Sequence, residues 1–216
     1  MNNKVLLSAL MPRTEVSLES LVASLESNGE NGSTTREREY EIYGRVADME
    51  ALQKASSSEF QEQWGIPCNE VVMGTIRVRK TVKGDVTTIN QTIKVKEEDG
   101  SDENEMDISQ ETFDIFKKLV PRGLLKTRYF FPLEGTDFTL EVDVFQDLEG
   151  KQCDEVKIDI EVPDGVELDQ IKIPFKLEDV RVIKPGIKTP EDGEYVRNLF
   201  VNKFEVVNPY HKKKED

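Results

Sequence analysis

Histidine and cysteine are scarce in this chain. Its 216 residues include one histidine, His211, and two cysteines, Cys68 and Cys153, which show no metal-ligand spacing. A zinc centre needs several such ligands, and histidine-based acid–base chemistry needs a histidine beside its partners. The composition therefore argues against zinc sites and against histidine catalysis.

Long hydrophobic runs are also missing. The stretch Val5–Met11 is apolar but short, and polar sequence follows it. A membrane-spanning helix needs about 20 mostly apolar residues, so the sequence predicts no span, and it shows no signal peptide. We expect a cytoplasmic protein with reduced thiols and no membrane partner.

Positive charge is in deficit. Lysine and arginine number 29 against 43 aspartates and glutamates, which gives a formal net charge of −14. Such a chain repels polyanions on average, so we expect no nucleic-acid partner, although a local basic cavity is compatible with this balance. The charged fraction, 33%, exceeds the usual ~25%. This composition suits a hollow fold with a polar lining as well as a merely soluble one.

The sequence divides into three parts, namely an N-terminal extension (1–34), a folded domain (35–208) and a disordered tail (209–216). In the extension, Thr14 caps a predicted short helix whose leucines follow helical spacing, and a glycine- and serine-containing linker comes after it. This helix docks on its own domain, docks on a protein partner, or stays mobile, and the sequence leaves these alternatives open. A homodimer also remains open.

The stretch Leu124–Phe145 is the centre of the domain. Two runs alternate strictly, Lys126-Thr-Arg128 and Glu141-Val-Asp143, and turn residues separate them. Successive side chains in a strand point to opposite faces, so a hairpin would set two cations beside two anions. The same alternation recurs on other predicted strands: Arg36–Val46 (Glu37, Glu39, Glu41), Glu70–Val82 (Arg77, Arg79), Val86–Lys96 (Lys94, Lys96) and Asp154–Val162 (Asp159, Glu161).

Helices are predicted between these strands. Asp48 and Ser109 begin apolar patterns of helical period over Asp48–Trp64 and Ser109–Val120, and Thr189 followed by proline starts a third helix. The acidic run Glu97–Glu105 is predicted to be a loop. Either the charged strand faces are solvated, as in an ordinary α+β protein, or they line the inside of a barrel whose apolar outer face the helices cover.

The charged strands, in their order, resemble the CYTH family, also called the triphosphate tunnel metalloenzymes. The first strand resembles the family's ExExK motif in either of two registers, starting at Glu37 or at Glu39, and Lys126-Thr-Arg128-Tyr129 is similar to its KxRY strand. Further similar segments are Arg77 with Arg79, Thr92-Ile93-Lys94, Glu141-Val-Asp143 and Asp159-Ile-Glu161. The resemblance implies an α+β, β-rich fold, a closed eight-stranded antiparallel barrel with a charged lumen and with helices packed outside.

The resemblance also implies a function. This family includes class IV adenylate cyclases, thiamine triphosphatases and inorganic triphosphatases, so we expect Mg²⁺- or Mn²⁺-dependent hydrolysis of a small triphosphate, with cyclase activity less favoured. The implied sites are substrate-binding cations (Arg77, Arg79, Lys94, Lys96, Lys126, Arg128), metal-binding carboxylates (Glu39, Glu141, Asp143, Asp159, Glu161) and catalytic groups (Glu39, Glu41, Lys126).

Two departures from the family pattern support an alternative. The lysine of the first motif is replaced by Glu41 or by Tyr43, depending on the register, and Glu103 stands where the family often has a basic residue. Losing cations weakens the binding of a polyanion. The alternative is therefore a catalytically divergent module of the same fold that binds a nucleotide, a polyphosphate or a protein partner.

Overall fold

The computed structural model describes residues 38–67, 74–97, 100–162, 171–184 and 189–211. All of them belong to one compact unit, Glu37–Asp216. The predicted extension 1–34, with its helix starting at Thr14, lies outside the described residues. No described helix combines the length and the hydropathy needed to cross a membrane.

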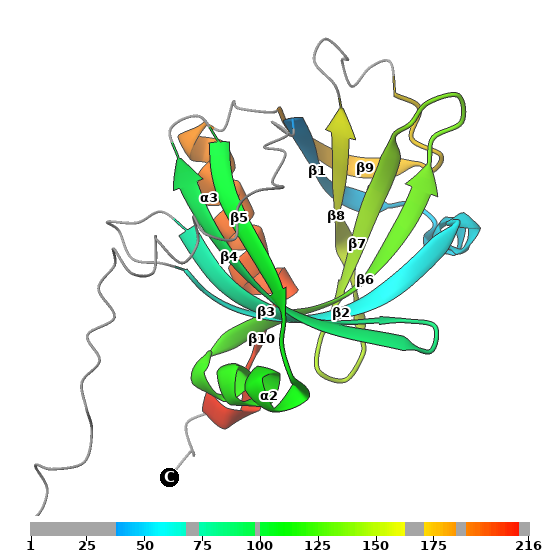
Figure 1. Ribbon diagram of the computed structural model, residues 1–216. Coiled ribbons are helices and arrows are strands. Elements are labelled where there is room, and N and C mark those ends of the chain that lie inside the picture. The colour runs from blue at the N-terminus through cyan, green and yellow to red at the C-terminus, as the bar shows by residue number, and fades with distance from the viewer. Residues whose placement is uncertain (1–37, 68–73, 98–99, 163–170, 185–188, 212–216) are drawn as a thin grey trace, which may run out of the picture. The chain divides into compact units, whose positions relative to one another are not determined.

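One ten-stranded antiparallel sheet dominates the described domain (Figure 1). Nine strands follow the order β5-β4-β3-β2-β6-β7-β8-β1-β9, and β10 pairs with β6. The strands are β1 (Arg38–Val46), β2 (Ser57–Pro67), β3 (Gly74–Lys83), β4 (Val86–Glu97), β5 (Gly100–Asp107), β6 (Arg122–Pro132), β7 (Thr139–Gln146), β8 (Gln152–Val162), β9 (Leu177–Ile183) and β10 (Glu205–Val207).

The antiparallel, β-rich α+β prediction is confirmed, but the strand count and closure differ from it. The sheet has ten strands rather than eight. Figure 1 shows the sheet curling so that β5 and β1 stand on opposite walls, yet the two edge strands, β5 and β9, do not pair within the described residues. The sheet is therefore curled and open along its hydrogen-bonded path, and closure into a barrel is not observed.

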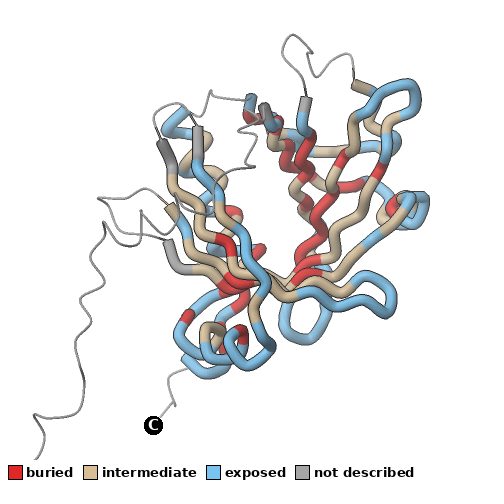
Figure 2. Tube along the Cα trace, in the orientation of Figure 1, coloured by how far each residue is buried: buried red, intermediate tan, exposed pale blue. Residues whose placement is uncertain are grey.

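The outer face of the curled sheet carries the largest apolar core. Ile42, Val142 and Ile158 lie opposite one another on β1, β7 and β8, and all three are fully buried. In Figure 2 the buried residues concentrate along these same three strands. A short 3₁₀ helix, η1 (Met49–Lys54), covers this face through Leu52, together with the segment from Ile171 to Leu177. Alternation thus sends the other side chains of these strands to the inner face.

The predicted helix Asp48–Trp64 is wrong after its first turn. Asp48 does cap η1, accepting a hydrogen bond from the Glu50 amide, but Ser57–Pro67 form β2. Consecutive serines disfavour helix because their hydroxyls compete for backbone groups. Ladders with β3 on one side and β6 on the other then stabilise the strand. The loop predicted at Glu97–Glu105 is likewise mostly strand β5, paired with β4.

Two longer helices lie on opposite faces of the sheet. The predicted helix after Ser109 is confirmed as α2 (Gln110–Leu119), which packs on the outer face through Phe113, against Trp64. The helix after Thr189 is confirmed as α3 (Pro190–Leu199), with a capping box at its start, and it continues into a π-helical turn, η3 (Phe200–Phe204).

The placement of α3 corrects the prediction that all helices pack outside. α3 and η3 pack against Tyr43 of β1 and Phe145 of β7. Each of these two residues lies two positions from a charged residue of its strand and so shares the same face. α3 and η3 therefore cover the inner face at one end. The predicted disordered tail starts at Pro209, but Pro209–His211 form a 3₁₀ turn, η4, and residues 212–216 lie outside the described residues.

Candidate functional site

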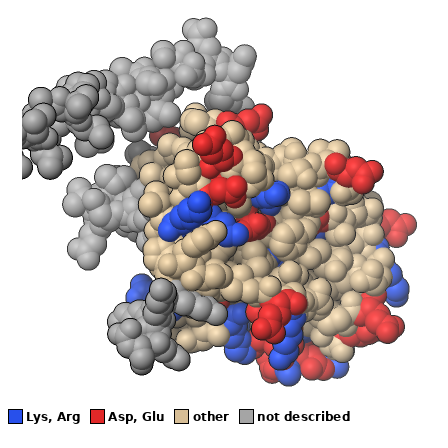
Figure 3. Space-filling view, turned by 90° about the horizontal axis from the view of Figure 1, so that it is seen from below, with Lys and Arg blue, Asp and Glu red and all other residues tan. Residues whose placement is uncertain are grey.

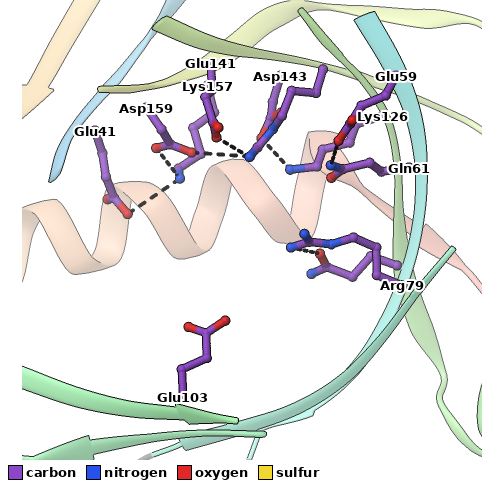
Figure 4. Close-up of polar contacts among 12 residues, drawn as sticks. Glu41, Glu59, Gln61, Arg79, Glu103, Lys126, Glu141, Asp143, Lys157 and Asp159 are labelled. Carbon is purple, nitrogen blue, oxygen red and sulfur yellow. Dashed lines mark hydrogen bonds and ion pairs between the residues drawn. The ribbon is translucent and has the colours of Figure 1, made fainter. Parts of the chain in front are cut away.

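The predicted charged side chains share the inner face of the sheet, which we call the charged face. Figure 4 shows side chains of β1, β7 and β8 and those of β2 and β6 projecting into the same space, with Glu103 of β5 on the opposite side. By contrast, acidic and basic side chains are interspersed on the molecular surface seen in Figure 3. The charged face is defined by Glu39, Glu41, Tyr43, Glu59, Gln61, Gln63, Arg77, Arg79, Lys94, Glu103, Lys126, Arg128, Glu141, Asp143, Lys157, Asp159 and Glu161.

Burial contradicts the alternative of a solvated sheet face. Asp143, Asp159 and Lys126 retain only 1%, 5% and 6% of their surface exposed. Charges that are taken out of water this far are tolerated only when partners compensate them. The chain therefore holds its ionic groups here in a defined network rather than in bulk solvent.

Carboxylates gather on β1, β7 and β8. The ladder register sets Glu41 opposite Asp159 and Asp159 opposite Glu141, with Glu39 opposite Glu161 in the next pair. Four acidic residues also line a pocket of about 220 Å³: Asp137, Glu141, Asp159 and Glu161, together with Phe138 and Thr139. Three of the five predicted metal ligands thus share one pocket.

Lys157 is a site residue that the sequence analysis left out. Its Nζ lies 2.5 Å from Asp159 Oδ1 and 3.8 Å from Glu41 Oε1. Burial opposes its charge, but Asp159 and Glu41 raise the pKa of Lys157 above its ordinary value. The signal was present, since Lys157 and Asp159 are two residues apart on β8 and so share one face of the strand. It was missed because a lone lysine in an acidic strand has no like-charged partner.

Asp143 is the centre of the cationic side of the site. It accepts a hydrogen bond of 2.5 Å from Lys126 Nζ and a bidentate pair of 2.7 and 2.9 Å from the Arg128 guanidinium. Burial alone would raise its pKa, but these two cations outweigh burial and lower the pKa of Asp143. Arg128 also contacts Glu141, and it lies 3.6 Å from Asp159. One arginine therefore ties β6 to two acidic strands.

Lys126 has an unusual proton affinity. Burial is the main cause that lowers its pKa to about 8, Asp143 acts in the opposite direction, and Arg128 and Arg79 lower it further. A lysine with such a pKa exchanges its proton near neutral pH, so it can act as an acid or a base. Its position beside Arg128 also suits it to bind an anion.

Arg79 lacks an acidic partner in direct contact among the described residues. Its guanidinium makes one long polar contact with the described residues, 3.5 Å from Nη2 to Gln63 Oε1, and its buried Nε has no hydrogen-bond partner among them. Burial lowers the pKa of Arg79, and the neighbouring charges of Arg77 and Arg128 lower it further, whereas the more weakly acting charges of Glu105 and Asp143 oppose this shift. A desolvated guanidinium among other cations is electrostatically incomplete without an anion.

The remaining predicted residues lie nearer the edges of the face. Arg77 Nη2 and Lys94 Nζ each lie 3.2 Å from a different oxygen of Glu103, so β5 neutralises the cations of β3 and β4. Lys96 lies within β4, but its side chain is not among those described. Glu39 is exposed at the rim. Partial desolvation of its carboxyl, and then the charge of Asp159, raise the pKa of Glu39 to about 8.

Comparisons with known proteins give limited similarity. No protein-family model matches the chain, and no curated protein matches it significantly. PH1819 from Pyrococcus horikoshii OT3 has a TM-score of 0.42 and 19% identity, over 61% of this chain and 82% of that one. A candidate adenylate cyclase (bh2851) from Bacillus halodurans has a TM-score of 0.30 and 17% identity, over 69% of this chain and 77% of that one. Function must therefore be argued from this chain's own residues.

Proposed function

We propose that the charged face binds a triphosphate-containing molecule together with Mg²⁺ or Mn²⁺ and hydrolyses one of its phosphoanhydride bonds. The candidate ligands are inorganic triphosphate, a nucleoside triphosphate and thiamine triphosphate. The observation that carries the proposal is Arg79, a desolvated cation that makes no direct ion pair among the described residues and whose Nε has no hydrogen-bond partner there. A bound phosphate would supply the missing anion.

The cations would divide the task of holding the phosphates. Arg79, Arg128 and Lys126 lie close together: the charges of Arg128 and Arg79 lower the pKa of Lys126, and the charge of Arg128 lowers the pKa of Arg79. A phosphate among them would accept several charge-assisted hydrogen bonds, which are roughly twice as strong as neutral ones. Arg77 and Lys94 would bind further phosphate oxygens, in competition with Glu103.

The acidic pocket would hold the metal. Its carboxylates, Glu141, Asp159 and Glu161, are the oxygen ligands that Mg²⁺ and Mn²⁺ prefer. The donor set therefore fits such an ion. When bound, the ion would polarise phosphoryl oxygens.

The chain's own groups would handle the attacking water and the protons. Glu41, on the acidic strand beside Lys157, would orient water and accept its proton. Water would attack phosphorus, the anhydride oxygen would leave, and Lys126 would hold a proton against a phosphoryl oxygen during this step. Glu39, with a pKa of about 8, would keep its proton at neutral pH unless a bound cation displaced it.

One observation favours the catalytically divergent binding module as a second candidate. Two of the predicted metal ligands already bind cations of the chain, Asp143 to Lys126 and Arg128, and Asp159 to Lys157. Carboxylates that are paired internally are less available to a metal. In this case a triphosphate would bind through the cations without turnover.

Two assays separate these candidates. Isothermal titration with tripolyphosphate, ATP and thiamine triphosphate in the presence of Mn²⁺ measures binding, and phosphate release measures turnover. Arg79→Gln should weaken binding about 10- to 100-fold, because charge-assisted hydrogen bonds contribute about 1.5–3 kcal/mol. Lys80→Gln is the matched control, since Lys80 is the next residue on β3, points to the other face and bonds Gln110. Equal effects of both changes would contradict the proposal.

A further inference from the structure

The charged face is graded from a rim to a floor. At the rim, Glu39 and Glu161 face each other across the ladder and both are exposed. Two residues further along β1 and β8, Glu41 lies opposite the buried Asp159. Burial therefore increases along the strands, and the outermost charges are carboxylates.

The floor is cationic. Along β6 and β7, Lys126 lies opposite Phe145, and Arg128 lies opposite Asp143. Gln61 of β2 lies beside Lys126 and is buried, with its Oε1 unpaired. An anion entering from the acidic rim would thus meet the buried Lys126 at the inner end.

The floor is also closed by aromatic rings. Phe145 stacks on Phe204 of η3 with ring centroids 3.9 Å apart, and Phe200 meets Phe145 edge-on at 5.8 Å. The Lys126 ammonium lies 6.0 Å from the centroid of the Phe145 ring. Figure 4 shows α3 crossing behind the charged side chains, in agreement with these contacts. Lys126 therefore lies directly against the closed end.

Further contacts fix the helix that closes this end. Asp192 at the start of α3 accepts two hydrogen bonds from Arg181 of β9, at 2.7 and 2.9 Å. The Arg181 guanidinium also lies 4.7 Å from the centre of the Tyr195 ring, and Tyr195 packs edge-on against Tyr43 at 6.0 Å. The closure is thus anchored near both ends of α3 and η3.

We infer that the charged face binds its ligand end-on and requires a terminal phosphate that carries no large substituent. This inference rests on the proposed function. The terminal phosphate would lie among Lys126, Arg128 and Arg79, and any organic substituent would point back to the acidic rim. A triphosphate with a large group on each end has no such orientation, because the second group would have to occupy the space of Phe145, Phe200 and Phe204. A face open at both ends would accept such a molecule.

The test uses the unaltered full chain with four probes in Mn²⁺, measured by isothermal titration. Tripolyphosphate and ATP have free ends. Diadenosine triphosphate is blocked at both ends by nucleosides. The γ-methyl ester of ATP carries the same charge as diadenosine triphosphate, but a small methyl group replaces the second nucleoside. The end-on inference predicts that diadenosine triphosphate binds at least ~100-fold more weakly than ATP, because steric exclusion acts as a specificity device. The methyl ester should lose much less.

The outcomes are distinguishable. If diadenosine triphosphate and the methyl ester both bind within about threefold of ATP, end-on binding is refuted while triphosphate binding stands. If the methyl ester is as weak as diadenosine triphosphate, terminal charge rather than the closed end decides, and the inference fails. If neither tripolyphosphate nor ATP binds, the proposed function and the inference fail together.

Discussion

Asp143→Asn is the most informative single change, because Asp143 neutralises two buried cations. The variant keeps the shape of the side chain but removes its charge. An amide oxygen can still accept from one cation, whereas the amide NH₂ must then face the other. Lys126 at 2.5 Å and the bidentate Arg128 at 2.7 and 2.9 Å would both lose their main partner.

The expected loss follows from breaking a buried ion pair from one side. Such changes cost about 3–5 kcal/mol, because they leave an uncompensated buried charge. Asp143 is 1% exposed, so water cannot easily replace it. Deprotonation of Lys126 would reduce this loss of stability. Asp143 raises the pKa of Lys126, so without Asp143 that pKa falls below about 8. Lys126 would then shed its proton near neutral pH, and the deficit should be larger at pH 6 than at pH 8.5.

Urea unfolding measures this loss directly. The chain has one tryptophan, Trp64, which is fully buried, so its fluorescence reports the transition. Asp179→Asn is the matched control because its pair with Arg45 is exposed and its φ of 52° is tolerated by asparagine. It should change the free energy of unfolding by less than about 0.5 kcal/mol. A loss below about 1 kcal/mol for Asp143→Asn would refute the buried network.

Three further predictions concern packing, the helix start and the acidic strands. Gly123→Ala should destabilise by about 1–3 kcal/mol in urea unfolding, because its Cβ would lie 2.4 Å from the Trp64 ring, whereas Gly193→Ala in the open should stabilise by about 0.5–1 kcal/mol. Arg181 and Thr189 lower the pKa of Asp192 in the folded protein, so the ionised Asp192 carboxylate stabilises the fold at pH values above its ordinary pKa of 3.8. This stabilisation is lost as the pH falls through the pKa of the folded state. The difference in melting temperature between the unaltered chain and Asp192→Asn should therefore become smaller as the pH of the measurement is lowered. Lys157→Met should lower the melting temperature, because Asp159 loses its cationic partner. Added Mn²⁺ should raise the melting temperature of this variant by more than that of the unaltered chain, and equal increases would contradict a metal role for these carboxylates.

The hairpin of β6 and β7 was predictable because alternation fixes which side chains share a face. Lys126 and Arg128 had to lie together, as did Glu141 and Asp143, whatever the rest of the chain did. The sequence could not reveal that Arg128 would bind Asp143 while Arg79 would lack an acidic partner in the described structure. That difference depends on which strands become neighbours, and β2 separates β3 from β6.

The errors arose where local pattern and strand pairing disagree. The segment after Lys54 has apolar residues at helical spacing, but β2 gains ladders on both sides, and this tertiary gain outweighs local preference. β5 has almost no apolar residues, so periodicity could not identify it, and pairing of Glu103 with Lys94 explains its place. The covering of the charged face by α3 depends on Phe145 and Tyr43, which read as ordinary core residues in sequence.

The position of β1 in the sheet has a consequence for synthesis on the ribosome. β1 is the first described strand, yet among the described strands it pairs with β8 and β9 alone, and Arg38 pairs with Val162. While β2 through β7 emerge, β1 therefore has two open edges and an uncovered apolar side that includes Ile42. Open strand edges promote association between chains. Translation products that stop before Gln152 should therefore need a chaperone or aggregate, however well their other hairpins have formed.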